Sequence, residues 1–100
     1  MIFTHRGVVT QMNIKQTYNK NTYNYTLLKS EQLTPKRIKA LYKQRKQTLE
    51  GEIVAYEVQI IRQETVFGEV KWMNPSNEDW GSYGWTYVNE DLAESKFASI

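Results

Sequence analysis

The sequence predicts an α+β fold, a two-layer sandwich in which two helices cover one face of an antiparallel sheet of about five strands (ββαβββα). Three observations predict it. Several segments alternate apolar and polar residues, two segments repeat apolar residues at helical spacing behind a capping residue, and the connections between segments are short. The chain has 100 residues and no cysteine. This length is enough for one hydrophobic core, so we expect a single domain over residues 1–100.

The first two strands are predicted to form a β-hairpin. Residues 8–18 and residues 22–28 each alternate apolar and polar side chains, as half-buried strands do. Residues 19–21 between them include two asparagines, which tolerate the left-handed backbone of a tight turn.

Thr34 and Pro35 are predicted to begin a helix that ends at Gly51. The Thr34 side chain can accept a hydrogen bond from a free N–H of the first turn, and Pro35 at the first helical position loses no hydrogen bond. Gly51 suits the left-handed backbone that often ends a helix. At helical spacing the apolar residues share one arc: Ile38, Leu41, Tyr42 and Leu49. The lysines share the opposite arc: Lys36, Lys39, Lys43 and Lys46.

The next segments are predicted to form a three-stranded antiparallel meander. Residues 53–62 and 66–72 alternate apolar and polar side chains and are joined by a turn at residues 63–64. After a polar loop over residues 74–79, the aromatic residues of segment 83–87 alternate as a third strand.

The last predicted element is a helix that begins after Asn89. The Asn89 side chain can cap free N–H groups, and Glu90 and Asp91 suit the positive end of the helix dipole. The apolar residues that follow are spaced four and three apart: Ala93, Phe97 and Ile100. This spacing predicts one apolar face packed on the sheet.

Catalytic and metal sites are not expected. His5 is the single histidine and cysteine is absent, which leaves no Cys–His pair and no multi-histidine metal site. No glycine-rich phosphate loop is present. Glu78 and Asp79 are explained by a polar loop, and Glu90 and Asp91 by the start of a helix. We therefore expect a protein that is not an enzyme and that has no cofactor.

The apolar segments are short. No stretch is long enough to span a bilayer, and no apolar run after Met1 could direct secretion. We therefore expect a cytoplasmic protein with no membrane partner. The low alanine content, with abundant Asn, Gln, Lys and Tyr, fits an AT-rich genome such as that of a phage or mobile element.

Basic and acidic side chains are concentrated in different halves of the chain. Residues 1–50 contain ten Lys or Arg and two acids, a formal charge of +8, whereas residues 51–100 contain three basic and nine acidic residues, a charge of −6. A basic helix face could follow a phosphate backbone without reading sequence. Its candidate residues are Lys36, Arg37, Lys39, Lys43 and Lys46. Tyrosines of the hairpin could stack on unpaired bases: Tyr18, Tyr23 and Tyr25. The alternative is that these lysines are simply the solvated side of a helix.

Arg45 falls within the apolar arc of the predicted helix. Because an unpaired buried guanidinium is costly, we expect it either to extend into solvent or to meet an acid of the sheet, with Glu57 and Glu69 as candidates.

Aromatic residues gather near the last predicted strand. The chain has three tryptophans and seven tyrosines. Trp85 is expected in the core, whereas Trp80 and Tyr83 are the candidate partner-binding residues, because Trp and Tyr often carry binding energy at interfaces. We therefore expect a small non-enzymatic binding or regulatory protein that acts by protein–protein recognition. Sequence-independent nucleic-acid binding through the basic face is the alternative.

Overall fold

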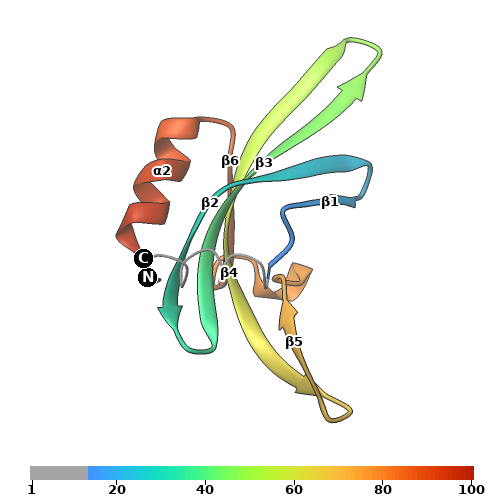
Figure 1. Cartoon of the computed structure of the whole chain (residues 1–100). Helices are drawn as coiled ribbons and strands as arrows, with labels where there is room; N and C mark the ends of the chain where they lie inside the picture. The colour runs from blue at the N-terminus through green and yellow to red at the C-terminus, as the bar shows by residue number, and fades with distance from the viewer. Residues whose placement is uncertain (1–13) are drawn as a thin grey trace, which may run out of the picture.

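A curled antiparallel sheet and one C-terminal helix make up the part of the chain that the computed structural model describes, residues 14–100 (Figure 1). The strands are β1 (Thr17–Lys20), β2 (Tyr23–Thr34), β3 (Arg37–Thr48), β4 (Gly51–Val66), β5 (Glu69–Met73) and β6 (Gly84–Tyr87). A short 3-10 helix, η1 (Asn77–Asp79), precedes β6, and α2 (Glu90–Ser99) follows it. The predicted strand over residues 8–13, and His5, lie outside the described residues.

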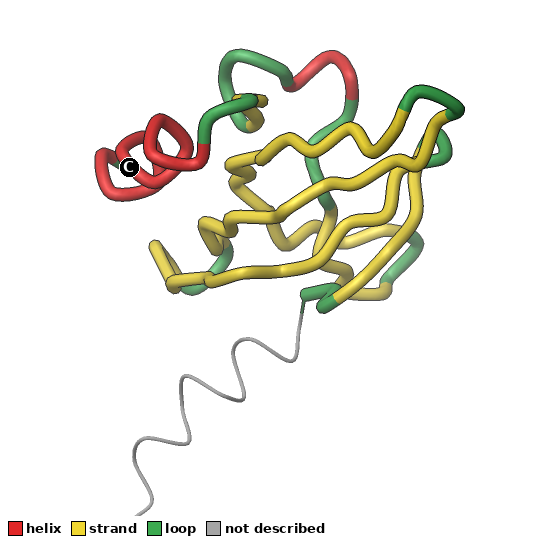
Figure 2. Tube along the Cα trace, turned by 90° about the horizontal axis from the view of Figure 1, so that it is seen from above, coloured by secondary structure: helices red, strands yellow, loops and turns green. Residues whose placement is uncertain are grey.

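The strands pair in the order β1-β2-β3-β4-β5, and β6 also pairs with β4. All pairs are antiparallel. The sheet curls like half of a barrel, and α2 lies outside the curve (Figure 2). The α+β class is therefore confirmed, but residues 14–100 contain one α-helix where the sequence analysis predicted two.

Both faces of the central strands are buried. The concave face carries one apolar cluster: Ile14, Tyr25, Ile38, Ala40, Tyr42 and Ile61. The face under α2 carries another: Leu41, Val58, Ala93 and Phe97. Between them, these clusters enclose the middle of β3 and β4.

The predicted helix from Thr34 to Gly51 is wrong. Residues 37–48 form β3, which pairs with β2 on one edge and with β4 on the other. Residues 38–42 are all buried, because β3 is covered on both faces. A strand that is buried on both faces has a nearly continuous apolar run rather than an alternating one, and such a run also fits the arc of a helix.

The ends of the predicted helix are turns between strands. Pro35 lies in the turn between β2 and β3. Leu49, which was placed on the apolar arc, is fully exposed in the turn between β3 and β4. Gly51 begins β4 with a φ of +129°, so its left-handed backbone follows a hairpin turn instead of a helix.

The predicted meander is also corrected. β4 is a strand of 16 residues that continues through the predicted turn at residues 63–64. The chain reverses instead at Phe67 and Gly68, whose φ angles are 51° and 83°. β6 does not pair with β5: β5 lies along Arg62–Val66 of β4 and β6 along Tyr56–Gln59. The two strands thus share one edge of β4, one after the other.

The last helix and a hairpin of the first two strands are confirmed, but of the strand predicted over residues 8–18 the described residues 14–16 are not in a strand, and β1 extends into the predicted turn. β1 and β2 form a hairpin whose turn lies at Asn21 and Thr22, one residue beyond the predicted centre. In α2, the Asn89 side chain accepts a hydrogen bond of 3.1 Å from the N–H of Leu92. Ala93 is buried in the cluster beneath the helix.

Candidate functional site

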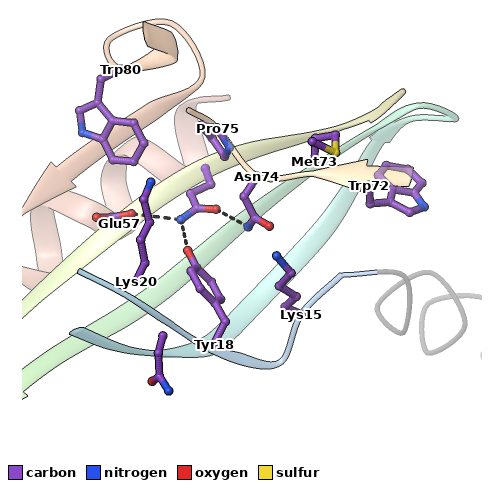
Figure 3. A pocket seen from close by; sticks show the side chains of 11 residues that line it. Lys15, Tyr18, Lys20, Glu57, Trp72, Met73, Asn74, Pro75 and Trp80 are labelled. Atoms are coloured by element: carbon purple, nitrogen blue, oxygen red, sulfur yellow. Dashed lines mark hydrogen bonds between the residues drawn. The ribbon is translucent and has the colours of Figure 1, made fainter. Parts of the chain in front are cut away.

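A hollow of about 300 Å³ opens on the concave face of the sheet (Figure 3). Its polar floor is formed by Glu57 and Gln59 of β4, and its walls include Tyr18 and Lys20 of β1 and Trp80. A second hollow of about 360 Å³ is also lined by Lys20, Glu57 and Trp80. These three residues therefore lie where the two hollows meet.

Side-chain hydrogen bonds connect the floor of the hollow into one network. The Asn74 Nδ2 group donates to Gln59 Oε1 over 2.9 Å. Gln59 Nε2 donates to the Tyr18 hydroxyl oxygen over 2.8 Å and to Glu57 Oε1 over 3.0 Å. The Tyr25 hydroxyl donates to Glu57 Oε2 over 3.1 Å. The Gln59 amide is therefore fully used, and the orientation of the Glu57 carboxylate is fixed from two sides.

Glu57 is a buried acid that no basic side chain of the described residues contacts. Its exposed fraction is 6%, and within residues 14–100 it forms no ion pair. Burial raises the pKa of Glu57, and the hydrogen bonds from Gln59 and Tyr25 and the charge of Lys20 offset only part of this effect. A positive charge that approaches such a carboxylate stabilises its ionised form.

Three tyrosines of β1, β2 and β3 pack against one another beside the floor. The rings of Tyr18 and Tyr25 are parallel, with centroids 4.4 Å apart, and Tyr42 meets Tyr18 edge-on at 5.3 Å. Burial raises the pKa of Tyr18 and of Tyr25, with the nearby Glu57 charge acting in the same direction. Burial also raises the pKa of Tyr42 to about 12. The three hydroxyl groups are therefore protonated at neutral pH.

The loop before β6 is fixed by Asp79. Its Oδ2 atom accepts hydrogen bonds from the N–H of Ser76, over 2.9 Å, and from the Arg62 guanidinium, over 3.0 Å. These contacts, the Ser76 N–H foremost, lower the pKa of Asp79. Asp79 thus connects η1 to β4 directly before Trp80.

Trp80 is held in place from two directions. Its ring lies against Gly84, and its Nε1–H donates to Thr86 Oγ1 over 3.1 Å. The N–H of Gly81 closes the loop by donating to the carbonyl of Gly84 over 2.8 Å. Trp80 keeps 37% of its surface exposed. The position of the indole is therefore set by the protein itself, without a partner.

Tyr83, the second candidate partner-binding residue, is not beside Trp80 in either hollow. It is half-buried, and the guanidinium of Arg62 lies 4.1 Å from the centre of its ring. The guanidinium of Arg37 lies 5.5 Å from the same ring. Trp80 and Tyr83 therefore do not form one binding site: Trp80 lines the hollows, whereas Tyr83 packs against two arginines.

The basic residues predicted on one helix face are distributed over different surfaces. Lys36 lies in a turn, and Arg37 lies near Tyr83. Lys39 and Lys43 alternate with the concave-side residues of β3, whereas Lys46 lies over the Tyr23 ring, at 5.4 Å from its centre. A strand places successive residues on opposite faces, so Lys46 lies on the face opposite Lys39 and Lys43, and the five candidates do not form one continuous basic face.

Lys39 is buried and contacts the end of α2, although the sequence predicted it on a solvated helix face. Its exposed fraction is 4%, and its Nζ donates to the carbonyls of Phe97, over 2.8 Å, and Ile100, over 3.2 Å. Its Nζ also lies 3.6 Å from Glu31. Lys39 therefore caps the C-terminal end of α2, where a positive charge is favourable.

Arg45 meets an acid of the sheet as expected, but the candidate acids Glu57 and Glu69 are wrong. Arg45 forms a two-pronged ion pair with Glu52 across the β3–β4 hairpin, with distances of 2.9 and 3.1 Å. It is exposed, because β3 is a strand and residue 45 lies beyond its buried centre. Glu57 belongs to the hollow, and Glu69 lies 3.8 Å from Lys71.

The network on the floor of the hollow was not predicted from the sequence. One signal was present: Glu57 and Gln59 interrupt an apolar run at alternate positions, which places two polar side chains on one face of a buried strand. The contributions of Asn74, Tyr18 and Lys20 depend on how distant segments meet, and no local pattern indicates them.

Comparison of the chain with protein-family models, with curated proteins and with solved structures finds no match. Within residues 14–100, no group of three or more His, Cys, Asp or Glu side chains could hold a metal ion. Over the same residues, no helix is long and apolar enough to cross a membrane.

Proposed function

We propose that this protein is a non-catalytic recognition module that binds a partner protein on the concave face of its sheet, with Trp80 as the anchoring side chain. The observation that carries the proposal is the preset indole of Trp80, which lines both hollows while Gly84 and Thr86 hold it in place. A rigid aromatic side chain binds with less loss of conformational entropy than a mobile one.

The size and shape of the site support recognition of a side chain. A hollow of about 300 Å³ lies at the small end of ligand pockets, which suits one inserted side chain better than a large ligand. An indole beside a partly closed hollow is also typical of the few residues that carry most of the energy at protein interfaces.

The use of the polar groups supports binding over catalysis. Each oxygen of Glu57 accepts a hydrogen bond from within the protein, and Gln59 uses all of its hydrogen-bonding groups. Such a network fixes the shape of the surface. Nucleic-acid binding has less support, because the five candidate basic residues do not form one continuous face and Lys39 is buried against α2.

The proposal is tested by selecting binders from a random peptide library on the immobilised full chain. We expect the selected peptides to lose binding to Trp80→Ala and to keep binding to Phe67→Ala. Phe67 is a matched control because it is a fully exposed aromatic residue at the tip of another hairpin. Peptides that bind Trp80→Ala as well as the unaltered protein, or no enrichment over unfolded protein, would contradict the proposal.

A further inference from the structure

We propose that the side chain received by the hollow is an arginine of the partner, with its guanidinium against Trp80 and its charge beside Glu57, in the place that Lys20 takes in the free protein. This inference rests on the proposed function and specifies the chemistry of the same site.

Glu57 supplies the charge that an arginine would meet. It accepts hydrogen bonds from two neutral donors, Tyr25 and Gln59, and each carboxylate oxygen has further capacity to accept. Within residues 14–100 no lysine or arginine forms an ion pair with it. A buried carboxylate without a cation is unfavourable, and a guanidinium that approaches it would relieve this.

Lys20 shows that a cation can occupy this position. It is the basic residue that both hollows share with Glu57 and Trp80. Figure 3 shows its side chain running from β1 toward the side of the hollow where these two residues lie. Its charge lowers the pKa of Glu57, yet in the described part of the chain Lys20 forms neither an ion pair nor a cation–π contact. Lys20 therefore compensates the charge of Glu57 only weakly, and a cation in direct contact would compensate it better.

The charges that line the hollow favour a cationic ligand side chain over an acidic one, because the negative charge is fixed and the positive charges can move away. The Glu57 carboxylate is buried and held by Tyr25 and Gln59, so it cannot turn away from a ligand. Lys15 is exposed and Lys20 is half-buried, and their long side chains can move their ammonium groups into solvent. An acidic side chain on the floor would be repelled by the charge that cannot move.

Arginine fits the aromatic wall better than lysine. A planar guanidinium stacks on an indole face and keeps its N–H groups free in the plane for a carboxylate. One side of the Trp80 ring lies against Gly84, and the surface that remains exposed lines the hollows together with Glu57. The site thus combines exposed indole surface and a carboxylate acceptor in one place.

The first test uses three short peptides and the unaltered full chain. The probe is acetyl-Gly-Gly-Arg-Gly-Gly-amide, and the matched peptides carry citrulline or glutamate at the centre. We follow the Nε1–H resonance of Trp80 by ¹H–¹⁵N NMR during titration. The arginine peptide should shift this resonance, and the shift should reach a plateau as the peptide concentration rises. The citrulline peptide, which keeps the shape without the charge, should bind about tenfold more weakly. The glutamate peptide should leave the resonance unchanged.

The second test changes the charges of the protein. Glu57→Gln should weaken arginine-peptide binding by about tenfold, whereas Lys20→Met should strengthen it by about threefold because the internal competitor is gone. Lys15→Met is the control at the other rim of the hollow and should change binding by less than about twofold. The NMR spectrum of each variant reports whether it folds. If a variant does not fold, the comparison of arginine with citrulline on the unaltered protein still tests the inference.

Equal binding of arginine and citrulline, stronger binding of glutamate, no shift with any peptide, or an unchanged affinity in Glu57→Gln would overturn the inference. The proposed function fails separately. If library peptides bind through Trp80 without a basic residue, the recognition module stands and the arginine inference is wrong. If the arginine peptide binds but the selected peptides bind independently of Trp80, the hollow is an arginine site and the recognition module anchored by Trp80 is wrong.

Discussion

The Trp80 ring lies on Gly84 so closely that a β-carbon at residue 84 would be 2.5 Å from Cζ3 of the indole. A bridge between the two residues and the N–H of Gly81 bonded to the carbonyl of Gly84 bring the segments together. Glycine is therefore required at residue 84 because the backbone of β6 is the surface on which Trp80 rests.

Gly84→Ala should displace Trp80 and destabilise the fold by about 1–3 kcal/mol, the usual range for an overpacked site. Urea unfolding measures the free energy, and the Trp80 Nε1–H resonance reports the displacement. In a Trp80→Ala background the same substitution should have almost no effect, because its collision partner is gone. An equal loss of stability in both backgrounds would place the origin of the effect elsewhere.

Lys39→Met should lower the free energy of unfolding by about 1–3 kcal/mol, because the carbonyls at the end of α2 lose a charged donor. Lys43→Met is the control, since residue 43 lies on the same face of the same strand but is less buried. It should change stability by less than about 0.5 kcal/mol. Urea denaturation compares the two, and equal effects would contradict the capping role of Lys39.

Glu57→Gln should make the protein more stable than the unaltered chain at pH 7. Because burial raises the pKa of Glu57 in the folded state, ionisation opposes folding. The contribution of Glu57 to stability is therefore present below the unfolded pKa of about 4.3 and is lost as pH rises through the folded pKa. Glutamine does not titrate, and the Tyr25 hydroxyl can turn to accept from its amide.

The measurement is the melting temperature of both proteins across this pH range. The advantage of Glu57→Gln should shrink toward zero below about pH 4, where both side chains are neutral. A constant difference at all pH values, or a less stable variant at pH 7, would show that the charge of Glu57 is better compensated than the hydrogen bonds indicate.

Asp79→Asn should have the opposite dependence on pH. The N–H of Ser76 and the Arg62 guanidinium lower the pKa of Asp79, so its contribution is present above the unfolded pKa of about 3.9 and is lost as pH falls through the folded pKa. We expect a lower melting temperature than the unaltered protein at pH 7 and a smaller difference at about pH 2. Thermal unfolding followed by circular dichroism tests this, with Glu78→Gln in the same turn as control.

Local patterns in the sequence were sufficient for the outer elements of the fold. The hairpin of β1 and β2 has an exposed side, so its alternation is visible in the sequence, and α2 begins at a capping residue, Asn89, whose hydrogen bond forms as predicted. In both cases one face contacts the core and the other contacts solvent, which is the condition under which periodicity reports structure.

The same reasoning failed where the chain is covered on both sides. Residues 38–42 have no solvent face, so their apolar pattern fits a helix and a strand equally well, and Thr34 and Pro35 start a turn as readily as a helix. The end of β4 was missed for a different reason: the polar pair Gln63 and Glu64 suggested a turn, whereas the strand continues through it and the chain reverses at Phe67 and Gly68.

The α+β class, the final helix with its cap, and Trp80 as a candidate binding residue all follow from the sequence alone. The tertiary structure alone decided that residues 37–48 pair with two neighbouring strands, that Lys39 serves α2, and that Glu57 lies at the base of a hollow beside Trp80 and Lys20. The physical reason is that these features depend on hydrogen bonds and burial between segments far apart in the chain, and such contacts leave no periodic trace within either segment.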